Sequence, residues 1–287
     1  MKFKYDLCIR LLFVVALTTL AACKTRKGST GYFKIKPTNN DSAARYKKNI
    51  LSVSNAIFTP FEYTGSNQTT IKYRLLAPPK EKRVQNYPLV LVLHGSGAIG
   101  ADNSAQLGVL AKLWAQANIR AKYPAYVVVP QFAVRSSNYL LDNTYKVLAS
   151  TPDPSLTSVF QLIDSLKKTY PIDSRRIYVI GFSMGASAAI NSLGLRPDLF
   201  AAAVSISGIP DFKHLNTLAK MPIWFIHGNA DTENPISSDS VLYKNLQLLH
   251  APKIKYWEID NLSHEVYPEL YIGNTIPEWL FKQKKGD

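Results

Sequence analysis

Short apolar blocks recur along the chain, separated by longer stretches in which polar residues are frequent. The blocks are rich in Val, Ile, Leu and aromatic residues, and most contain no charged side chain. Apolar runs of this length are typical of strands that are buried on both faces of a parallel sheet. We therefore predict strands at residues 88–94 ("PLVLVLH"), 125–130 ("AYVVVP"), 176–181 ("RIYVIG"), 201–207 ("AAAVSIS"), 222–228 ("PIWFIHG") and 253–259 ("KIKYWEI").

The stretches between these blocks have helical spacing. Between residues 155 and 170, apolar side chains recur at intervals of three and four and so share one helix face, at Leu156, Val159, Phe160, Ile163 and Leu166. Further helices are predicted at residues 104–120, 184–195, 238–250 and 276–285. Strands that alternate with helices favour a mostly parallel central sheet with helices on both faces.

Two other segments flank this alternating pattern. Residues 56–79 read as two strands around a turn at Gly65, which predicts an N-terminal antiparallel hairpin. Residues 131–154 show neither the helical nor the strand spacing of apolar residues, and they are predicted to be irregular. Residues 55–287 are thus expected to form one α/β domain with a core of ordinary size.

The amino-terminal segment has the pattern of an export signal. Lys2, Lys4 and Arg10 precede an apolar run at 11–22 that is short for a membrane span, and small residues follow it. The run ends "LAAC", which is similar to a bacterial lipobox with Cys23 as the acylated first residue; the alternative is an ordinary signal peptide. We predict a lipoprotein signal peptide at 1–22 and a flexible, basic, lipidated tether at 23–54.

This interpretation places the protein in the bacterial cell envelope as a lipoprotein anchored through Cys23, either in the outer membrane or facing the periplasm. The second cysteine, Cys8, leaves with the signal, so the mature domain is expected to have no disulfide and no cysteine metal site. The net charge of +14 arises mostly from residues 24–83, beside the proposed anchor, where it favours an anionic membrane surface. Since no basic nucleic-acid-binding motif is present, nucleic acid is not an expected partner.

The residues that follow the predicted strands carry the candidate chemistry, because parallel sheets place their sites at the carboxyl ends of strands. The strand at 176–181 runs into "GFSMG", a G-x-S-x-G pattern around Ser183. A buried strand before it and a small-residue helix after it are the context of a nucleophile elbow. Side chains at Gly181 or Gly185 would collide with the neighbouring strand and helix, so Ser183 is the candidate nucleophile.

A serine hydroxyl needs a base and a group that orients the base. Asp231 follows the strand at 222–228, and His264 lies in a loop after the strand at 253–259, so the order Ser183, Asp231, His264 is the one expected for this elbow. Glu233 and Asp260 are the rival acids. The other histidines precede the acid or end a helix.

Two backbone N–H groups are expected to stabilise an oxyanion. One is that of Met184, directly after the nucleophile, and the other comes from the loop "HGSG", where Ser96 is preferred and Gly95 is the rival. A phosphate-binding loop is the alternative interpretation of these glycines, but its motifs are absent from the sequence. His94 is expected to brace the loop rather than to react.

These motifs resemble the α/β-hydrolase superfamily. The closest resemblance is to bacterial secreted esterases and peptidases related to polyhydroxybutyrate depolymerases, feruloyl esterases and dienelactone-hydrolase-like proteins; the matching stretches lie between residues 87 and 281. The resemblance implies the α/β-hydrolase fold, the triad Ser183, Asp231 and His264, and neither cofactor nor metal. Ala186 stands where related sequences commonly have a second glycine. This difference weakens any assignment of a relative's substrate to this chain.

The function expected from the sequence is hydrolysis of a carboxylic ester, carbohydrate-linked or with another short acyl group, through an acyl-enzyme. A serine peptidase and a non-catalytic binding lipoprotein of the same fold are the alternatives. The acyl and alcohol groups cannot be read from the sequence. Candidates for the pocket lining are the side chains of Phe132, Arg135, Tyr139 and Trp257, although such aromatic residues more often belong to a core.

Overall fold

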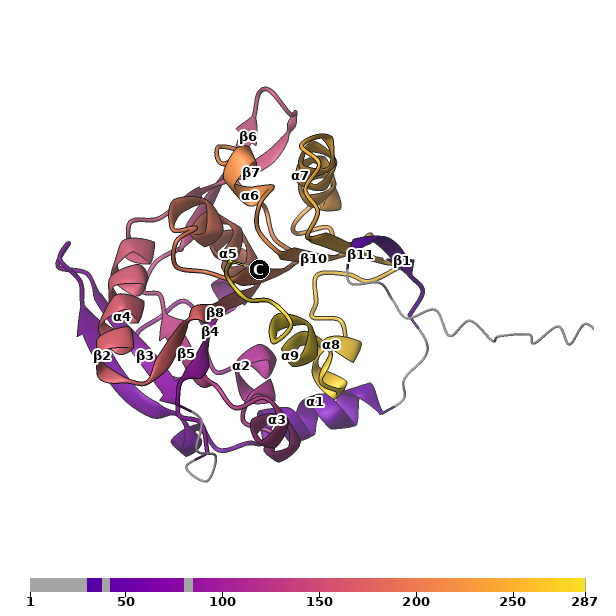
Figure 1. The fold of residues 1–287 in the computed structure, drawn as a ribbon. Helices are drawn as coiled ribbons and strands as arrows, with labels where there is room; N and C mark the ends of the chain where they lie inside the picture. Colours follow the sequence, from indigo (N-terminus) through magenta and orange to yellow (C-terminus); the bar gives the residue numbers. More distant parts are fainter. Residues whose placement is uncertain (1–29, 38–41, 80–84, 287) are drawn as a thin grey trace, which may run out of the picture.

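A twisted, mostly parallel sheet forms the centre of the molecule (Figure 1). The structure, a computed structural model, describes residues 30–37, 42–79 and 85–286. Within these residues nine strands form the sheet, in the order β1-β11-β10-β9-β8-β4-β5-β3-β2. The strands are β1 (Gly31–Ile35), β2 (Thr59–Thr64), β3 (Thr70–Leu76), β4 (Tyr87–Leu93), β5 (Tyr126–Gln131), β8 (Ile172–Phe182), β9 (Ala202–Ile206), β10 (Ile223–Gly228) and β11 (Ile254–Ile259).

The direction of the strands divides the sheet into two parts. From β1 to β5 along the sheet all neighbours are parallel. The segments predicted as a hairpin are β2 and β3, which pair antiparallel with each other, while β3 is also antiparallel to β5. Every residue of β4 and β5 is buried, which explains why both strands are apolar except for Gln131 at the end of β5.

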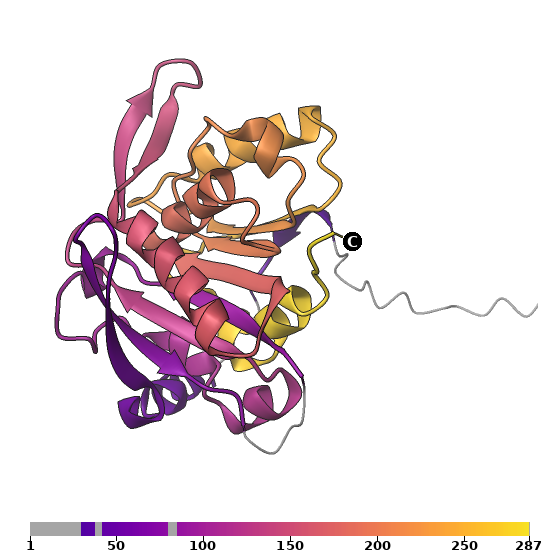
Figure 2. The same ribbon diagram turned by 60° about the vertical axis from the view of Figure 1, so that its left-hand side comes forward.

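Helices cover both faces of the sheet, as predicted, and give two apolar cores (Figures 1 and 2). One core contains side chains of α4 (Ser155–Thr169), α5 (Met184–Leu195), α6 (Leu215–Leu218) and α7 (Ile236–Leu248). The other contains those of α2 (Val109–Leu113), α3 (Ala117–Lys122), α8 (Glu269–Ile272) and α9 (Thr275–Leu280). The predicted α/β-hydrolase architecture is therefore confirmed.

The prediction of a flexible tether over 23–54 is wrong for much of that segment. Gly31–Ile35 is β1, which pairs in parallel with β11 at the edge of the sheet. Ala43–Leu51 is α1, which contacts α2 and α8 and buries Ile50. Both elements bury only some of their side chains, and their basic residues remain exposed. The composition of the segment is therefore polar and basic, like that of a flexible tether.

The predicted signal peptide and Cys23 lie outside the described residues, so lipid anchoring stays a prediction. Among the helices that the structure describes, none has the length and apolar character needed to cross a bilayer.

Two further expectations differ from the structure. Residues 131–154 are not irregular, because β6 (Ser137–Asp142) and β7 (Val147–Pro152) form an antiparallel arm that projects from the body (Figures 1 and 2). The single helix predicted at 104–120 is divided into α2 and α3, because Gln116 has an extended ψ of 134°. The arm was not visible as strands because Leu140 and Leu141 of β6 are exposed, and only Val147 and Ala149 of β7 pack against the core.

Candidate active site

Ser183 occupies the sharp turn between β8 and α5. Its φ of 56° and ψ of −124° lie outside the regions that a residue with a side chain ordinarily adopts. Strain of this kind persists only where the surroundings enforce it, and it is concentrated at functional sites. Here the backbone N–H of Ser183 donates to the carbonyl of Ile206 in β9, which ties the turn to the neighbouring strand.

The two flanking glycines make this turn possible, as the sequence predicts. A Cβ atom at Gly181 would overlap the carbonyl of Gly185, and a Cβ atom at Gly185 would overlap the carbonyl of Leu93 at the end of β4. Both obstacles are backbone atoms, which cannot rotate away. Ala186 is tolerated after the elbow because it faces Gly208, where a Cβ atom would come within 2.9 Å of the Ala186 methyl group.

Replacing Gly185 with alanine should therefore destabilise the fold. We expect Gly185→Ala to lower the free energy of unfolding by about 3 kcal/mol or more, because the new methyl group forces β4 and α5 apart. Urea unfolding followed by circular dichroism measures this. Gly273→Ala is the matched control: its Cβ atom would have no neighbour within 4 Å, so its stability should stay within about 1 kcal/mol of the wild type. Equal stabilities of the two variants would contradict the steric argument.

The structure brings the three predicted triad residues together. His264 Nε2 lies 2.8 Å from Ser183 Oγ, and His264 Nδ1 lies 2.7 Å from Asp231 Oδ2. Because an ionised carboxylate only accepts hydrogen bonds, Asp231 holds the proton on Nδ1 and leaves the Nε2 lone pair for the serine hydroxyl. The ring of Phe182 lies beneath the imidazole, with 4.9 Å between the ring centroids.

Asp231 is well placed to remain ionised. Its other oxygen, Oδ1, accepts the backbone N–H groups of Glu233 (3.0 Å) and Asn234 (2.9 Å). Burial alone would raise the pKa of Asp231, but the donors His227 and His264 and the backbone N–H of Asn234 outweigh it and hold the pKa below its ordinary value.

The rival acids are placed differently. Glu233 Oε2 lies 3.7 Å from His264 Nε2, on the side of Ser183 rather than of Nδ1, and its side chain is 73% exposed. Asp260 accepts a hydrogen bond from Asn229 Nδ2 at 3.0 Å and forms an ion pair with Lys34. Of the three carboxylates, Asp231 is therefore the one that contacts Nδ1.

A second histidine, to which the sequence analysis assigns no role, lies behind Asp231. The His227 side chain is fully buried at the end of β10, with Nε2 3.4 Å from Asp231 Oδ2 and 2.9 Å from the carbonyl oxygen of Asn234. Its Nδ1 lies 2.8 Å from Oδ2 of Asp239, a fully buried residue of α7. Since Nε2 faces two acceptors, it must carry a hydrogen.

The His227–Asp239 pair holds a proton at neutral pH. Burial would lower the pKa of His227, but hydrogen bonds with Asp231 and Asp239 outweigh it and raise the pKa to about 9. Burial raises the pKa of Asp239 as well. Sequence spacing did not reveal this pair because it joins a strand to a separate helix.

The predicted oxyanion donors lie beside Ser183. Met184 is the first residue of α5, and Ser96 is the first residue of a short 3₁₀ helix, Ser96–Ala98, so neither N–H has an acceptor within its own helix. A Cβ atom at Gly95 would lie 3.5 Å from Ser183 Cβ, which shows that the loop touches the turn. Gly95 and Ser96 both remain candidates for the second donor.

His94 braces this loop, as predicted. Its Nε2 accepts the backbone N–H of Phe132 (2.9 Å), so Nδ1 carries the hydrogen and donates to the carbonyl of Gly95 (2.8 Å). Burial lowers the pKa of His94 and keeps the ring neutral. The loop that carries the candidate donors is thereby fixed to the end of β5.

The candidates for a substrate pocket are divided between core and surface. Phe132 and Trp257 are buried in the two apolar cores and are not free to line a pocket. Tyr139 of β6 is hydrogen-bonded to Ser187 Oγ (3.0 Å), one turn beyond Ser183, and the guanidinium of Arg135 lies 5.0 Å from its ring. The arm therefore begins beside the site.

The sequence model of the phospholipase/carboxylesterase family matches residues 79–270. The chain belongs to this family. The matched range spans the elbow, Asp231 and His264, so the residues that meet in the structure all fall inside the region that the family shares. In the part of the chain that the structure describes, no group of three or more His, Cys, Asp or Glu side chains is arranged to hold a metal ion.

Individual relatives of this phospholipase/carboxylesterase-family chain are esterases and depolymerases by name. This chain is 33% identical over 95 residues (33% of this chain) to a bifunctional acetylxylan esterase/xylanase, XynS20E, of Neocallimastix patriciarum. It is 31% identical over 126 residues (44% of this chain) to a poly(3-hydroxyalkanoate) depolymerase C of Paucimonas lemoignei. It spans 14% and 28% of their respective lengths. A solved thermostable esterase superposes with a TM-score of 0.72 at 31% identity, over 80% of this chain and 64% of that one.

Proposed function

We propose that the protein is a serine carboxylic ester hydrolase. The observation that carries this proposal is the unbroken chain of short contacts from Ser183 Oγ through the His264 ring to Asp231, built on a strained turn at the carboxyl edge of the sheet. The names of the relatives, an acetylxylan esterase and a polyester depolymerase, support an ester rather than another acyl substrate.

The geometry supports the following first half-reaction. Ser183 Oγ attacks the ester carbonyl carbon while its proton passes to His264 Nε2, 2.8 Å away. Asp231 keeps Nδ1 protonated and stabilises the positive charge that the ring acquires. The negative oxygen of the tetrahedral intermediate accepts hydrogen bonds from the N–H groups of Met184 and of Ser96 or Gly95.

Collapse of this intermediate breaks the carbonyl–alkoxy bond, and the alcohol leaves with the proton from His264. The acyl group is now bonded to Ser183 Oγ. In the second half-reaction His264 takes a proton from a water molecule as its oxygen attacks the acyl carbon, and the proton returns to Ser183 when the carboxylic acid departs. The same ring thus acts first as base and then as acid in both halves.

Covalent labelling with a fluorophosphonate tests the proposed function. We expect the native full chain to react at one serine, and peptide mapping should locate the adduct on Ser183. Hydrolysis of 4-nitrophenyl butyrate should fall in proportion to labelling, whereas heat-denatured protein should remain unlabelled because the elbow and His264 are no longer assembled. A folded protein that neither labels nor hydrolyses any ester would overturn the proposal. The 4-nitroanilide of butyric acid tests the peptidase alternative in the same assay.

A further inference from the structure

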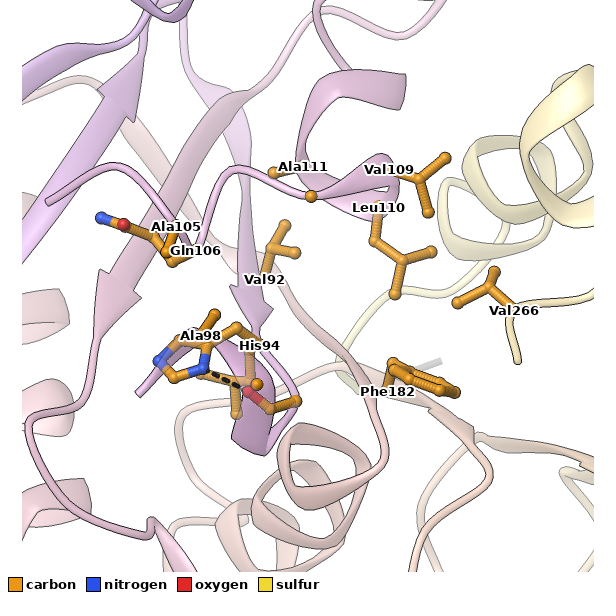
Figure 3. A pocket seen from close by; sticks show the side chains of 14 residues that line it. Val92, His94, Ala98, Ala105, Gln106, Val109, Leu110, Ala111, Phe182 and Val266 are labelled. Carbon is orange, nitrogen blue, oxygen red and sulfur yellow. Dashed lines mark hydrogen bonds between the residues drawn. The ribbon is translucent and has the colours of Figure 1, made fainter. Parts of the chain in front are cut away.

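A cavity of about 240 Å³ lies against the loop that carries the candidate oxyanion donors (Figure 3). It is bounded by the end of β4, the loop that follows it, and α2. Two residues on the opposite side complete the wall: Phe182, directly before Ser183, and Val266, two residues after His264. Four separate parts of the chain therefore converge on it, and three of them include or adjoin the candidate nucleophile, base or oxyanion loop.

The wall of the cavity is continuous with the reacting groups. Gly95 lines the cavity, and a Cβ atom at this position would lie 3.5 Å from Ser183 Cβ. Phe182 also lines it, and its ring packs against the ring of His264. An ester whose carbonyl oxygen lies at the loop would therefore have one of its two carbon chains directed along this wall.

The lining selects for an apolar occupant. Among the residues that the structure describes, no charged side chain borders the cavity, and the lining side chains are mainly aliphatic or aromatic, among them Val92, Ala98, Val109, Leu110, Phe182 and Val266. Of the two polar side chains, His94 is bonded to Gly95 and Phe132, and Gln106 Nε2 donates to Asn103 Oδ1, so Gln106 Oε1 is the one side-chain polar atom of this lining without a partner. A sugar or a charged group placed here would lose several hydrogen bonds to water, and the lining side chains offer one free acceptor in exchange.

The size of the cavity limits the occupant further. An apolar protein cavity of about 150 Å³ holds a benzene molecule, so 240 Å³ has room for a group of about six to ten carbons. An acetyl group would leave most of this space empty. Each methylene that moves from water into an apolar cavity favours binding by up to about fourfold.

We propose that this cavity binds the group on one side of the ester bond of the substrate, an uncharged apolar chain or ring of about six to ten carbons. The inference rests on the proposed ester hydrolysis and narrows it, because it excludes esters that have only small or polar groups on both sides. This group is either the acyl chain, which is bonded to the carbonyl carbon, or the alkyl chain of the alcohol, which is joined to that carbon through the ester oxygen.

Two series of esters distinguish these sources. In one series 4-nitrophenyl esters carry acyl chains from acetate to decanoate, and in the other, alkyl acetates carry alcohols from ethyl to decyl. We expect kcat/KM to rise at least tenfold over four added methylenes in one series and to change little in the other. The series in which kcat/KM rises identifies the side of the ester that the cavity binds. A flat or falling profile in both series would overturn the proposal.

Variants of the lining link the preference to this cavity. Val109→Phe fills the space and should lower kcat/KM for the octyl or octanoyl ester at least tenfold, with the shortest ester within about twofold of the wild type. Leu110→Ala enlarges the space and should shift the optimum to longer chains, which keeps the proposal testable if Val109→Phe misfolds. Val134→Phe, at a residue that is 55% exposed, is the control and should keep the wild-type profile.

The outcomes separate the two proposals. Unchanged chain-length profiles in both lining variants would overturn the cavity assignment while leaving ester hydrolysis intact, provided that Ser183 still reacts with the fluorophosphonate. Loss of labelling and of all ester turnover in the wild type would instead overturn the proposed function itself.

Discussion

Ser183→Ala is expected to lower kcat/KM for 4-nitrophenyl butyrate by about 10⁴- to 10⁶-fold, the scale of losing the nucleophile of a hydrogen-bonded triad. Removal of the hydroxyl leaves His264 and Asp231 in place but with no atom that can form the acyl-enzyme. Stopped assays at high enzyme concentration measure the residual rate, and circular dichroism verifies the fold. Little change in stability is expected, apart from the loss of one hydrogen bond.

His264→Ala and the double variant provide the internal comparison. Because the proposed mechanism couples the serine and the histidine in one proton transfer, each single variant should be about as slow as the double variant. Additive losses would show that the two residues act independently, and wild-type turnover by Ser183→Ala would identify another nucleophile. Either result would contradict the triad described above.

Asp239→Asn is expected to change how stability depends on pH. In the folded wild type the His227–Asp239 pair keeps its proton up to about pH 9, whereas an unfolded histidine loses it near pH 6.5. The stabilisation is therefore complete below pH 6.5 and is lost as the pH rises through 9. Across this window the free energy of unfolding should fall by about 1.4 kcal/mol per pH unit in the wild type.

The variant should lose part of this slope. With an amide in place of the carboxylate, His227 keeps only Asp231 as a charged partner against the effect of burial, so the pKa of His227 falls and the folded chain holds the extra proton over a narrower pH range. Breaking one partner of the buried pair should also cost about 3 kcal/mol at pH 7. Urea unfolding at four pH values between 6.5 and 9 measures both effects.

Groups that face the pair do not obscure this measurement. Asp231 stays ionised throughout the window because its pKa is lowered, and Tyr139 and Tyr256 stay protonated because burial raises their pKa values. Asp260→Asn makes the same chemical change at a carboxylate that is 27% exposed, and it should retain the wild-type slope. Equal slopes in Asp239→Asn and the wild type would show that the pair carries no extra proton.

Burial decides how much of the fold can be predicted from the sequence. All residues of β4 and β5 are buried, so hydrophobicity alone reveals these strands. In β1 the burial alternates, but over only five residues of which Ile35 alone is fully buried, and in β6 Leu140 and Leu141 are 69% and 60% exposed, so neither strand forms an apolar block. Hydrogen bonding to a neighbouring strand, which is not encoded locally, forms these two elements.

The same distinction applies to the site. Ser183, Asp231 and His264 each follow a strand of the parallel sheet, so their order along the chain is enough to predict that they meet. Asp239 lies within a helix, and its contact with His227 depends on how α7 packs against β10. The cavity likewise depends on the distance between α2 and the sheet, which no motif specifies.

The parallel pairing of β1 with β11 determines when the fold can be completed during synthesis. The ribosome makes β1 early, but its hydrogen-bonding partner emerges only after most of the α/β domain. Contacts between such distant segments form late. His264 follows β11 by a few residues, so the strand that closes this edge and the proposed base arrive together. A nascent chain thus carries Ser183 for the 81 residues that precede the proposed base, and under the proposed mechanism the serine is unreactive until β11 and His264 have been made.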